Sequence, residues 1–112
     1  MESYIYKGYS VRDKFDEQIV DEDDWSILLT QLSTQVLESD VVLDIGGFIG
    51  TFAVGVAGCA KSVITIEPVP ENYEMLLKNM HGKDNIFAYQ AAVIGGIYDK
   101  DEVALGIDRF PW

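Results

Sequence analysis

The feature that most constrains this chain is a glycine-rich turn placed directly after a short apolar run. The run is Val41–Ile45, and the pattern that closes it is Asp44-x-Gly46-Gly47-x-x-Gly50. Four or five apolar residues before such a turn are typical of a buried parallel strand. Glycines at this point let the backbone turn tightly and let a ligand approach the N-terminus of the next helix. The pattern therefore predicts an α/β fold with a ligand site at the end of this strand.

The residues that follow alternate between helical and strand patterns. The predicted elements are a helix over Thr51–Cys59, a strand over Ser62–Ile66, a helix from Pro70 to a stop at Gly82 and a strand over Ile86–Val93. The apolar stripe expected on the second helix is Tyr73, Leu76, Leu77 and Met80. Such alternation predicts parallel strands joined by right-handed crossovers, with Val41–Ile45 at the sheet edge.

The two ends of the chain carry weaker patterns. Tyr4–Ser10 predicts a short strand or an ordered arm, and seven acidic residues between Asp13 and Asp24 indicate a solvated surface that leads into a helix. The apolar positions of that helix are Trp25, Leu28, Leu29, Leu32 and Val36. Val103–Ile107 predicts one more strand. We divide the chain into an arm and helix (1–40), a core (41–97) and a C-terminal segment (98–112).

Composition excludes several classes of protein. The 112 residues allow one domain, and a formal net charge of −11 argues against a nucleic-acid binder. The single cysteine, Cys59, cannot form a disulfide framework, and no residue spacing indicates a metal site. Sixteen uncharged residues precede Lys61, but they include five glycines and fall short of the roughly 20 apolar residues of a membrane span. The N-terminus does not resemble a signal peptide. We expect a cytoplasmic protein without membrane contact.

Glu67 ends the second predicted strand, seventeen residues after Gly50, and there a carboxylate can accept both hydroxyl protons of a ribose. A dinucleotide turn would carry glycine where this chain has Ile45, and its pyrophosphate would be repelled by Asp44. S-adenosylmethionine instead brings an ammonium and a sulfonium group to this place. The charges favour S-adenosylmethionine over NAD.

These residues resemble a known family. Val42–Phe52 is similar to motif I of class I methyltransferases, and Val63–Tyr73, with its acidic-Pro-x-Pro-Glu-Asn-Tyr sequence, resembles the FkbM-type methyltransferases. Leu76-Leu77-x-Asn79 and the strand end Gln90-Ala91-Ala92-Val93 also match. The resemblance covers residues 15 to 97 and implies the first three strands of a doubly wound, Rossmann-like sheet.

The resemblance also implies roles for individual residues. Asp44, Gly46, Gly47 and Gly50 would line the methionine half of S-adenosylmethionine, and Glu67 would bind its ribose. Gln90 and Ala91 would border the adenine. Phe48 and Pro68 are further candidates for cofactor contact, although Phe48 is equally consistent with packing in the turn.

The chain departs from the family after its third strand, because no Lys-x-Asp-x-Glu-Gly-like segment follows. A general base and most acceptor-binding groups are therefore not identified; His81 reads as a solvent-facing helix end. We expect a truncated or split methyltransferase that acts on a hydroxylated small molecule or sugar. Its exposed strand edge would pair with itself or with a complementing C-terminal polypeptide. The alternatives are a non-catalytic nucleoside-binding or interaction module and an NAD-type binding domain.

Overall fold

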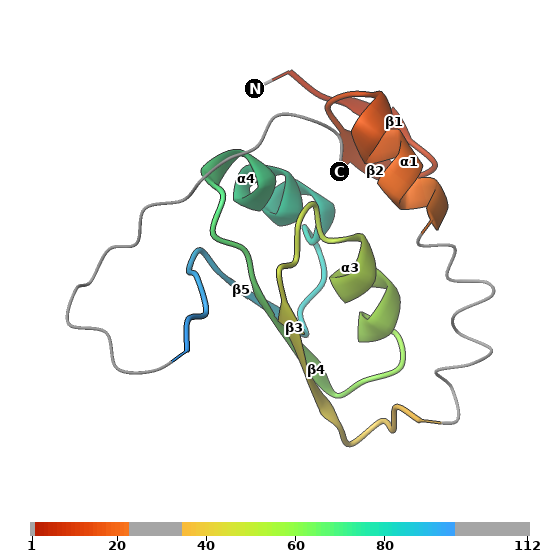
Figure 1. Ribbon diagram of the computed structural model, residues 1–112. Coiled ribbons are helices and arrows are strands. Elements are labelled where there is room, and N and C mark those ends of the chain that lie inside the picture. The colour runs from red at the N-terminus through yellow and green to blue at the C-terminus, as the bar shows by residue number, and fades with distance from the viewer. Residues whose placement is uncertain (1, 23–34, 96–112) are drawn as a thin grey trace.

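The computed structural model describes residues 2–22 and 35–95, which form a small antiparallel hairpin and a parallel sheet with helices (Figure 1). The hairpin pairs β1 (Tyr4–Tyr6) with β2 (Tyr9–Val11). The parallel sheet has the strand order β3-β4-β5. Its strands are β3 (Val41–Ile45), β4 (Ser62–Ile66) and β5 (Ile86–Tyr89), and the helices are α1 (Lys14–Glu22), α3 (Thr51–Ala57) and α4 (Pro70–Asn79).

The parallel sheet confirms the predicted fold class. β3 and β4 have the predicted bounds, α4 begins at Pro70, and β3 is an edge strand among the described residues. Both crossovers run in the same direction across the sheet, so α3 and α4 cover the same face. The buried residues between the sheet and α3 are Ala53, Val56, Ala57, Val63 and Ile86.

β5 is shorter than predicted, because it ends at Tyr89 and leaves Gln90 and Ala91 beyond the strand. The last bond of the ladder runs from the Glu67 N–H to the Tyr89 carbonyl at 3.1 Å. The next donor in a parallel register would be the Val69 N–H, but it donates to the Glu67 carboxylate instead. The pairing of β4 with β5 therefore stops where the Glu67 side chain captures the backbone.

The N-terminal segment forms a hairpin where the sequence predicted a single strand or arm. The chain reverses at Lys7 and Gly8, whose φ angles of 48° and 87° fit a two-residue turn with both residues left-handed. The hairpin and α1 pack on α4 and on the glycine turn through one buried cluster: Val11, Val20, Ile49 and Met75. The predicted arm is thus part of the packed structure.

One prediction about the helices changes, and others are not tested. On α4, Leu77 was expected in the apolar stripe but is 43% exposed, whereas Met75 is fully buried under the N-terminal segment. The predicted helix from Trp25 falls mostly on residues 23–34, and the predicted strand Val103–Ile107 falls on residues 96–112, outside the described part of the chain. The last apolar position of that helix, Val36, is described and packs against the buried residues between α3 and the sheet. None of the described helices has the length and hydropathy needed to cross a membrane.

Candidate cofactor site

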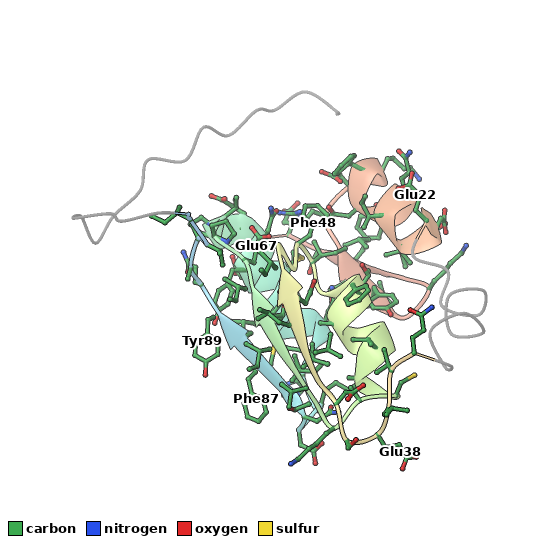
Figure 2. All side chains as sticks on the ribbon, turned by 60° about the horizontal axis from the view of Figure 1, so that its bottom comes forward. Glu22, Glu38, Phe48, Glu67, Phe87 and Tyr89 are labelled. Carbon is green, nitrogen blue, oxygen red and sulfur yellow. The ribbon has the colours of Figure 1, made fainter. Side chains whose placement is uncertain are left out.

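The candidate site lies at the carboxyl edge of the parallel sheet. The glycine turn follows β3, Glu67 follows β4, and Gln90 follows β5, so all three loops leave the sheet at one edge. Figure 2 shows Glu67 and Phe48 together at this edge. The structure therefore brings together the turn and Glu67, which are distant in sequence.

Backbone hydrogen bonds close the glycine turn upon itself and upon β4. The N–H groups of Gly46 and Gly47 both donate to the Ile66 carbonyl, at 2.8 and 3.0 Å, and the Gly50 N–H donates to the Gly47 carbonyl at 2.9 Å. The Phe48 N–H donates to Glu67 Oε1 at 2.9 Å. A turn that cradles phosphates directs its N–H groups at the anion. These four N–H groups are directed into the protein, which does not fit a pyrophosphate cradle.

The glycines of the turn are required for two different reasons. At Gly46 the φ angle is +81° and an added Cβ would meet nothing within 4 Å, so the position faces open space. At Gly47 an added Cβ would lie 2.1 Å from Thr65 Oγ1 and 2.8 Å from Leu76 Cδ1. Packing therefore excludes a side chain at Gly47, whereas the left-handed backbone disfavours one at Gly46 and at Gly50 (φ +91°).

Asp44 is held at the end of β3 by a side chain that the sequence analysis missed. The Thr65 hydroxyl donates to Asp44 Oδ2 at 2.9 Å, and Thr65 is fully buried. The two residues are opposite each other in the parallel register, on the face that the helices cover. A threonine within the apolar run Ser62–Ile66 was the available signal, since a buried hydroxyl requires a hydrogen-bond partner.

Glu67 is the most constrained carboxylate of the site. Its side chain is 95% buried, with Oε1 bonded to the Phe48 N–H and Oε2 bonded to the Val69 N–H at 2.8 Å. An ionised carboxylate has about four lone-pair positions, so each oxygen retains the capacity to accept a further donor. Glu67 can thus fix the turn and still accept hydrogen bonds from a ligand. Pro68, the next residue, is half-buried.

Phe48 packs against the N-terminal segment. Its ring contacts the ring of Phe15 edge-on, with centroids 5.9 Å apart, and the Arg12 guanidinium carbon lies 5.5 Å from its centroid. Its φ angle of 53° is left-handed, which is unusual for a residue with a Cβ. The Phe48 side chain therefore packs against Phe15 and Arg12, as one of its two predicted roles requires. A contact between this side chain and a cofactor stays a prediction.

The Arg12 guanidinium donates three hydrogen bonds to two side chains. Its Nε and Nη2 donate to the two oxygens of Asp16 at 2.7 and 3.0 Å, and Nη1 donates to Asn72 Oδ1 on α4 at 2.8 Å. Burial opposes the charge of Arg12, but the hydrogen bonds and the charge of Asp16 outweigh it and raise the pKa of Arg12. Asp16 is fully buried. The i, i+4 spacing of the pair was the only signal for it in the sequence.

The remaining candidates lie apart from this cluster. Gln90 and Ala91 are exposed beyond the end of β5, and their contact with a cofactor stays a prediction. His81 is exposed, as expected, and it follows the C-terminal end of α4, which is the edge of the sheet opposite to Glu67. Within residues 2–22 and 35–95, no three His, Cys, Asp or Glu side chains are grouped to hold a metal ion.

No family model and no curated protein matches the sequence. Solved structures do match. Phosphoethanolamine N-methyltransferase 1 of Haemonchus contortus, in complex with phosphoethanolamine and S-adenosylhomocysteine, is similar over 67% of this chain at 24% identity, with a TM-score of 0.57. A dimethyladenosine transferase of Plasmodium falciparum is similar over 74% of this chain at 26% identity, with a TM-score of 0.52. TYW2 of Pyrococcus horikoshii, in complex with MeSAdo, is similar over 80% at 18% identity, with a TM-score of 0.53.

The described part of the chain has a partial class I methyltransferase fold. The chain spans 16%, 28% and 35% of the lengths of the three neighbours, respectively. The neighbours belong to several methyltransferase families, so the likeness identifies the fold and leaves the substrate class open. It does not single out the FkbM type.

Proposed function

We propose that this chain binds S-adenosylmethionine as the cofactor-binding part of a methyltransferase. The observation that carries the proposal is the combination of two carboxylates, Asp44 and Glu67, with a turn in which the N–H groups of Gly46, Gly47, Phe48 and Gly50 are bonded within the protein. A cationic ligand with ribose hydroxyls fits carboxylate acceptors, whereas a pyrophosphate requires free N–H donors and no adjacent negative charge. The methyltransferase fold supports the same conclusion.

The residues of the site have separate roles in this proposal. Asp44, with the turn residues Gly46, Gly47 and Gly50, would hold the methionine half of the cofactor, and Glu67 would accept the ribose hydroxyls. Gln90 and Ala91 would border the adenine. When bound, the cofactor supplies a methyl group activated by a cationic sulfur. The protein then needs to hold that group against an acceptor atom, because positioning supplies much of the rate in such a transfer.

The finer assignment rests on the sequence alone. Because Glu67–Tyr73 resembles the FkbM type, we propose an oxygen atom of a hydroxylated small molecule or sugar as the methyl acceptor. We also propose that the chain associates with itself or with a complementing polypeptide. This association is supported by two features of the described residues: β3 is an edge strand, and Leu43 and Ile45 of β3 are each 58% exposed.

Isothermal titration of the chain with S-adenosylmethionine, S-adenosylhomocysteine and NAD tests the proposed cofactor. We expect saturable binding of the first two ligands and none of NAD. Asp44→Asn is the most informative variant, because an amide oxygen can still accept the Thr65 hydroxyl bond while the charge is lost. Removal of that charge should weaken S-adenosylhomocysteine binding about fivefold, and S-adenosylmethionine binding more, because the latter carries an additional positive charge.

The control for the charge is Asp84→Asn, which removes an exposed carboxylate from the loop before β5 and should leave binding unchanged. Glu67→Gln should weaken binding about tenfold, since a hydrogen bond to a charged acceptor is lost, with the exposed Glu74→Gln on α4 as its control. Tighter NAD binding by Asp44→Asn, with no response to S-adenosylhomocysteine, would favour the dinucleotide alternative. Saturable binding of S-adenosylmethionine without methyl transfer to any hydroxylated acceptor would favour the non-catalytic module.

A further inference from the structure

The N-terminal segment reaches the candidate cofactor site through the side chain of Arg12. This guanidinium lies over the Phe48 ring, and the Phe48 N–H in turn donates to Glu67 Oε1. A continuous set of contacts therefore links Arg12, the residue after β2, to the carboxylate proposed to bind the ribose.

Phe48 needs such support because its backbone is strained. A left-handed φ of 53° is unfavourable for a residue with a Cβ, and it persists only where surrounding contacts hold it. The backbone contact is the bond to Glu67, and the side chain packs against the buried cluster as well as against the ring of Phe15 and the guanidinium of Arg12. The ring contact and the cation–π contact both come from the N-terminal segment, residues 2–22.

Arg12 itself is held in a single position. Its two bonds to the buried carboxylate of Asp16 form a planar fork, and its third bond joins it to Asn72 on α4. The guanidinium bound in this way lies over the Phe48 ring, with its carbon 5.5 Å from the ring centroid. Lysine could pair with Asp16, but it could not form the fork, reach Asn72 at the same time or stack on the ring.

We propose that Arg12 is a positioning residue for the cofactor site: by stacking on Phe48 it keeps the Phe48 N–H on Glu67 and so orients the Glu67 carboxylate toward the ribose. The expected effect of Arg12 on ligand binding rests on the proposed function. Its expected effect on the conformation of the turn does not, because the Phe48–Glu67 bond exists in the chain without a ligand.

The effect on the conformation of the turn is tested by hydrogen exchange of backbone amides, monitored by NMR on the chain without cofactor. In Arg12→Lys the Phe48 amide should exchange about tenfold faster than in the unsubstituted chain, the loss expected for one cation–π contact of this kind. The Thr65 amide in β4 should keep its exchange rate, which shows that the sheet is intact. Lys7→Met is the matched control, because it breaks another ion pair between the hairpin and α1, Lys7–Asp21 at 2.6 Å, away from Phe48.

The effect on ligand binding is tested by measuring the affinity for S-adenosylhomocysteine. Arg12→Lys should weaken it about fivefold to tenfold and Lys7→Met should not. Phe48→Gly tests whether the ring itself has a role, because glycine adopts the left-handed φ without strain. Binding should weaken in this variant if Arg12 acts through the ring. Binding would improve if the ring had no role. In a double-substitution cycle, Arg12→Lys should have no further effect in the Phe48→Gly background.

The two proposals fail differently. If the unsubstituted chain does not bind S-adenosylhomocysteine, the cofactor assignment is wrong, and the exchange rate of the Phe48 amide still decides whether Arg12 positions the turn. Equal exchange of that amide in Arg12→Lys and Lys7→Met overturns the positioning role, and so do additive effects in the cycle.

Discussion

The two faces of the three-stranded sheet are covered very differently by the described residues. On the face toward α3 and α4, Val63 and Thr65 are fully buried and Ile86 is 4% exposed. On the opposite face, Leu43 is 58% exposed and Tyr89 is 57% exposed. Figure 2 shows Phe87 and Tyr89 projecting from β5 away from α3. The sheet thus has a face covered by α3 and α4 and, among the described residues, an open face whose large apolar side chains are exposed.

The open face is as apolar as the covered one. Its residues alternate with the buried ones along each strand and are Val41, Leu43, Ile45, Ile64, Ile66, Phe87 and Tyr89. Parallel sheets are almost always covered on both faces, and their strands are apolar on both sides for that reason. The composition of the strands therefore indicates a second covering layer on this face.

Equivalent Leu→Ala substitutions on the two faces should give the largest contrast in stability. Leu76 is fully buried where α4 meets the glycine turn, and Leu76→Ala should lower the free energy of unfolding by about 2–5 kcal/mol. Leu43 lies on the open face, and Leu43→Ala should cost less than about 1 kcal/mol. Urea unfolding at micromolar protein concentration measures both.

Repeating this experiment at higher protein concentration sharpens the comparison. A cost of Leu43→Ala that grows with concentration identifies a second copy of the chain as the cover of the open face. A cost equal to that of Leu76→Ala at every concentration contradicts the contrast between the faces.

The tightest point of the covered side is Gly47, and it should show the next largest effect. In Gly47→Ala the new methyl group would collide with Thr65 Oγ1 and Leu76 Cδ1, so the Thr65–Asp44 bond must break or the turn must move. We expect a loss of about 1–3 kcal/mol in the free energy of unfolding, measured by urea, together with weaker S-adenosylhomocysteine binding.

Gly58→Ala is the control for that substitution. Gly58 has a φ of −69°, and an added Cβ would come no closer than 3.8 Å to Gly55 O. The unfolding free energy should stay within about 0.5 kcal/mol of that of the unsubstituted chain. If Gly47→Ala is tolerated as well as Gly58→Ala, the turn is not packed as described.

The sequence predicted those strand and helix bounds that are set by residues close together in the chain. The β-branched run Ser62–Ile66 and the glycines after Ile45 set the bounds of β4 and β3, and Pro70 set the start of α4. Asp44 and Glu67 were identified because they end these strands. Their roles as cofactor ligands stay predictions.

The sequence did not predict what depends on contacts between distant segments. The stack of Arg12 on Phe48 joins residues 36 positions apart, and Met75 is buried only because the hairpin packs on α4. The early end of β5 depends on a side chain of β4, since Glu67 takes the Val69 N–H that would have extended the ladder. Periodicity describes one element at a time and carries no information on these pairings.

The smallest effect is expected at the outer surface of the covered side, where Tyr4 of β1 donates to Glu17 Oε1 of α1 at 2.8 Å. This hydrogen bond and, to a lesser extent, burial and the charge of Glu17 raise the pKa of Tyr4 to about 12. The folded chain therefore favours the neutral phenol. The contribution of this bond to stability is fully present below the ordinary tyrosine pKa of about 10 and is lost as the pH rises through the folded pKa. Ultraviolet absorbance of phenolate during an alkaline titration should show late titration of Tyr4, which Tyr4→Phe removes and Glu17→Gln returns toward the ordinary pKa. If the late titration persists in Tyr4→Phe, it belongs to another tyrosine, and the proposed effect of the Tyr4–Glu17 bond between β1 and α1 is wrong.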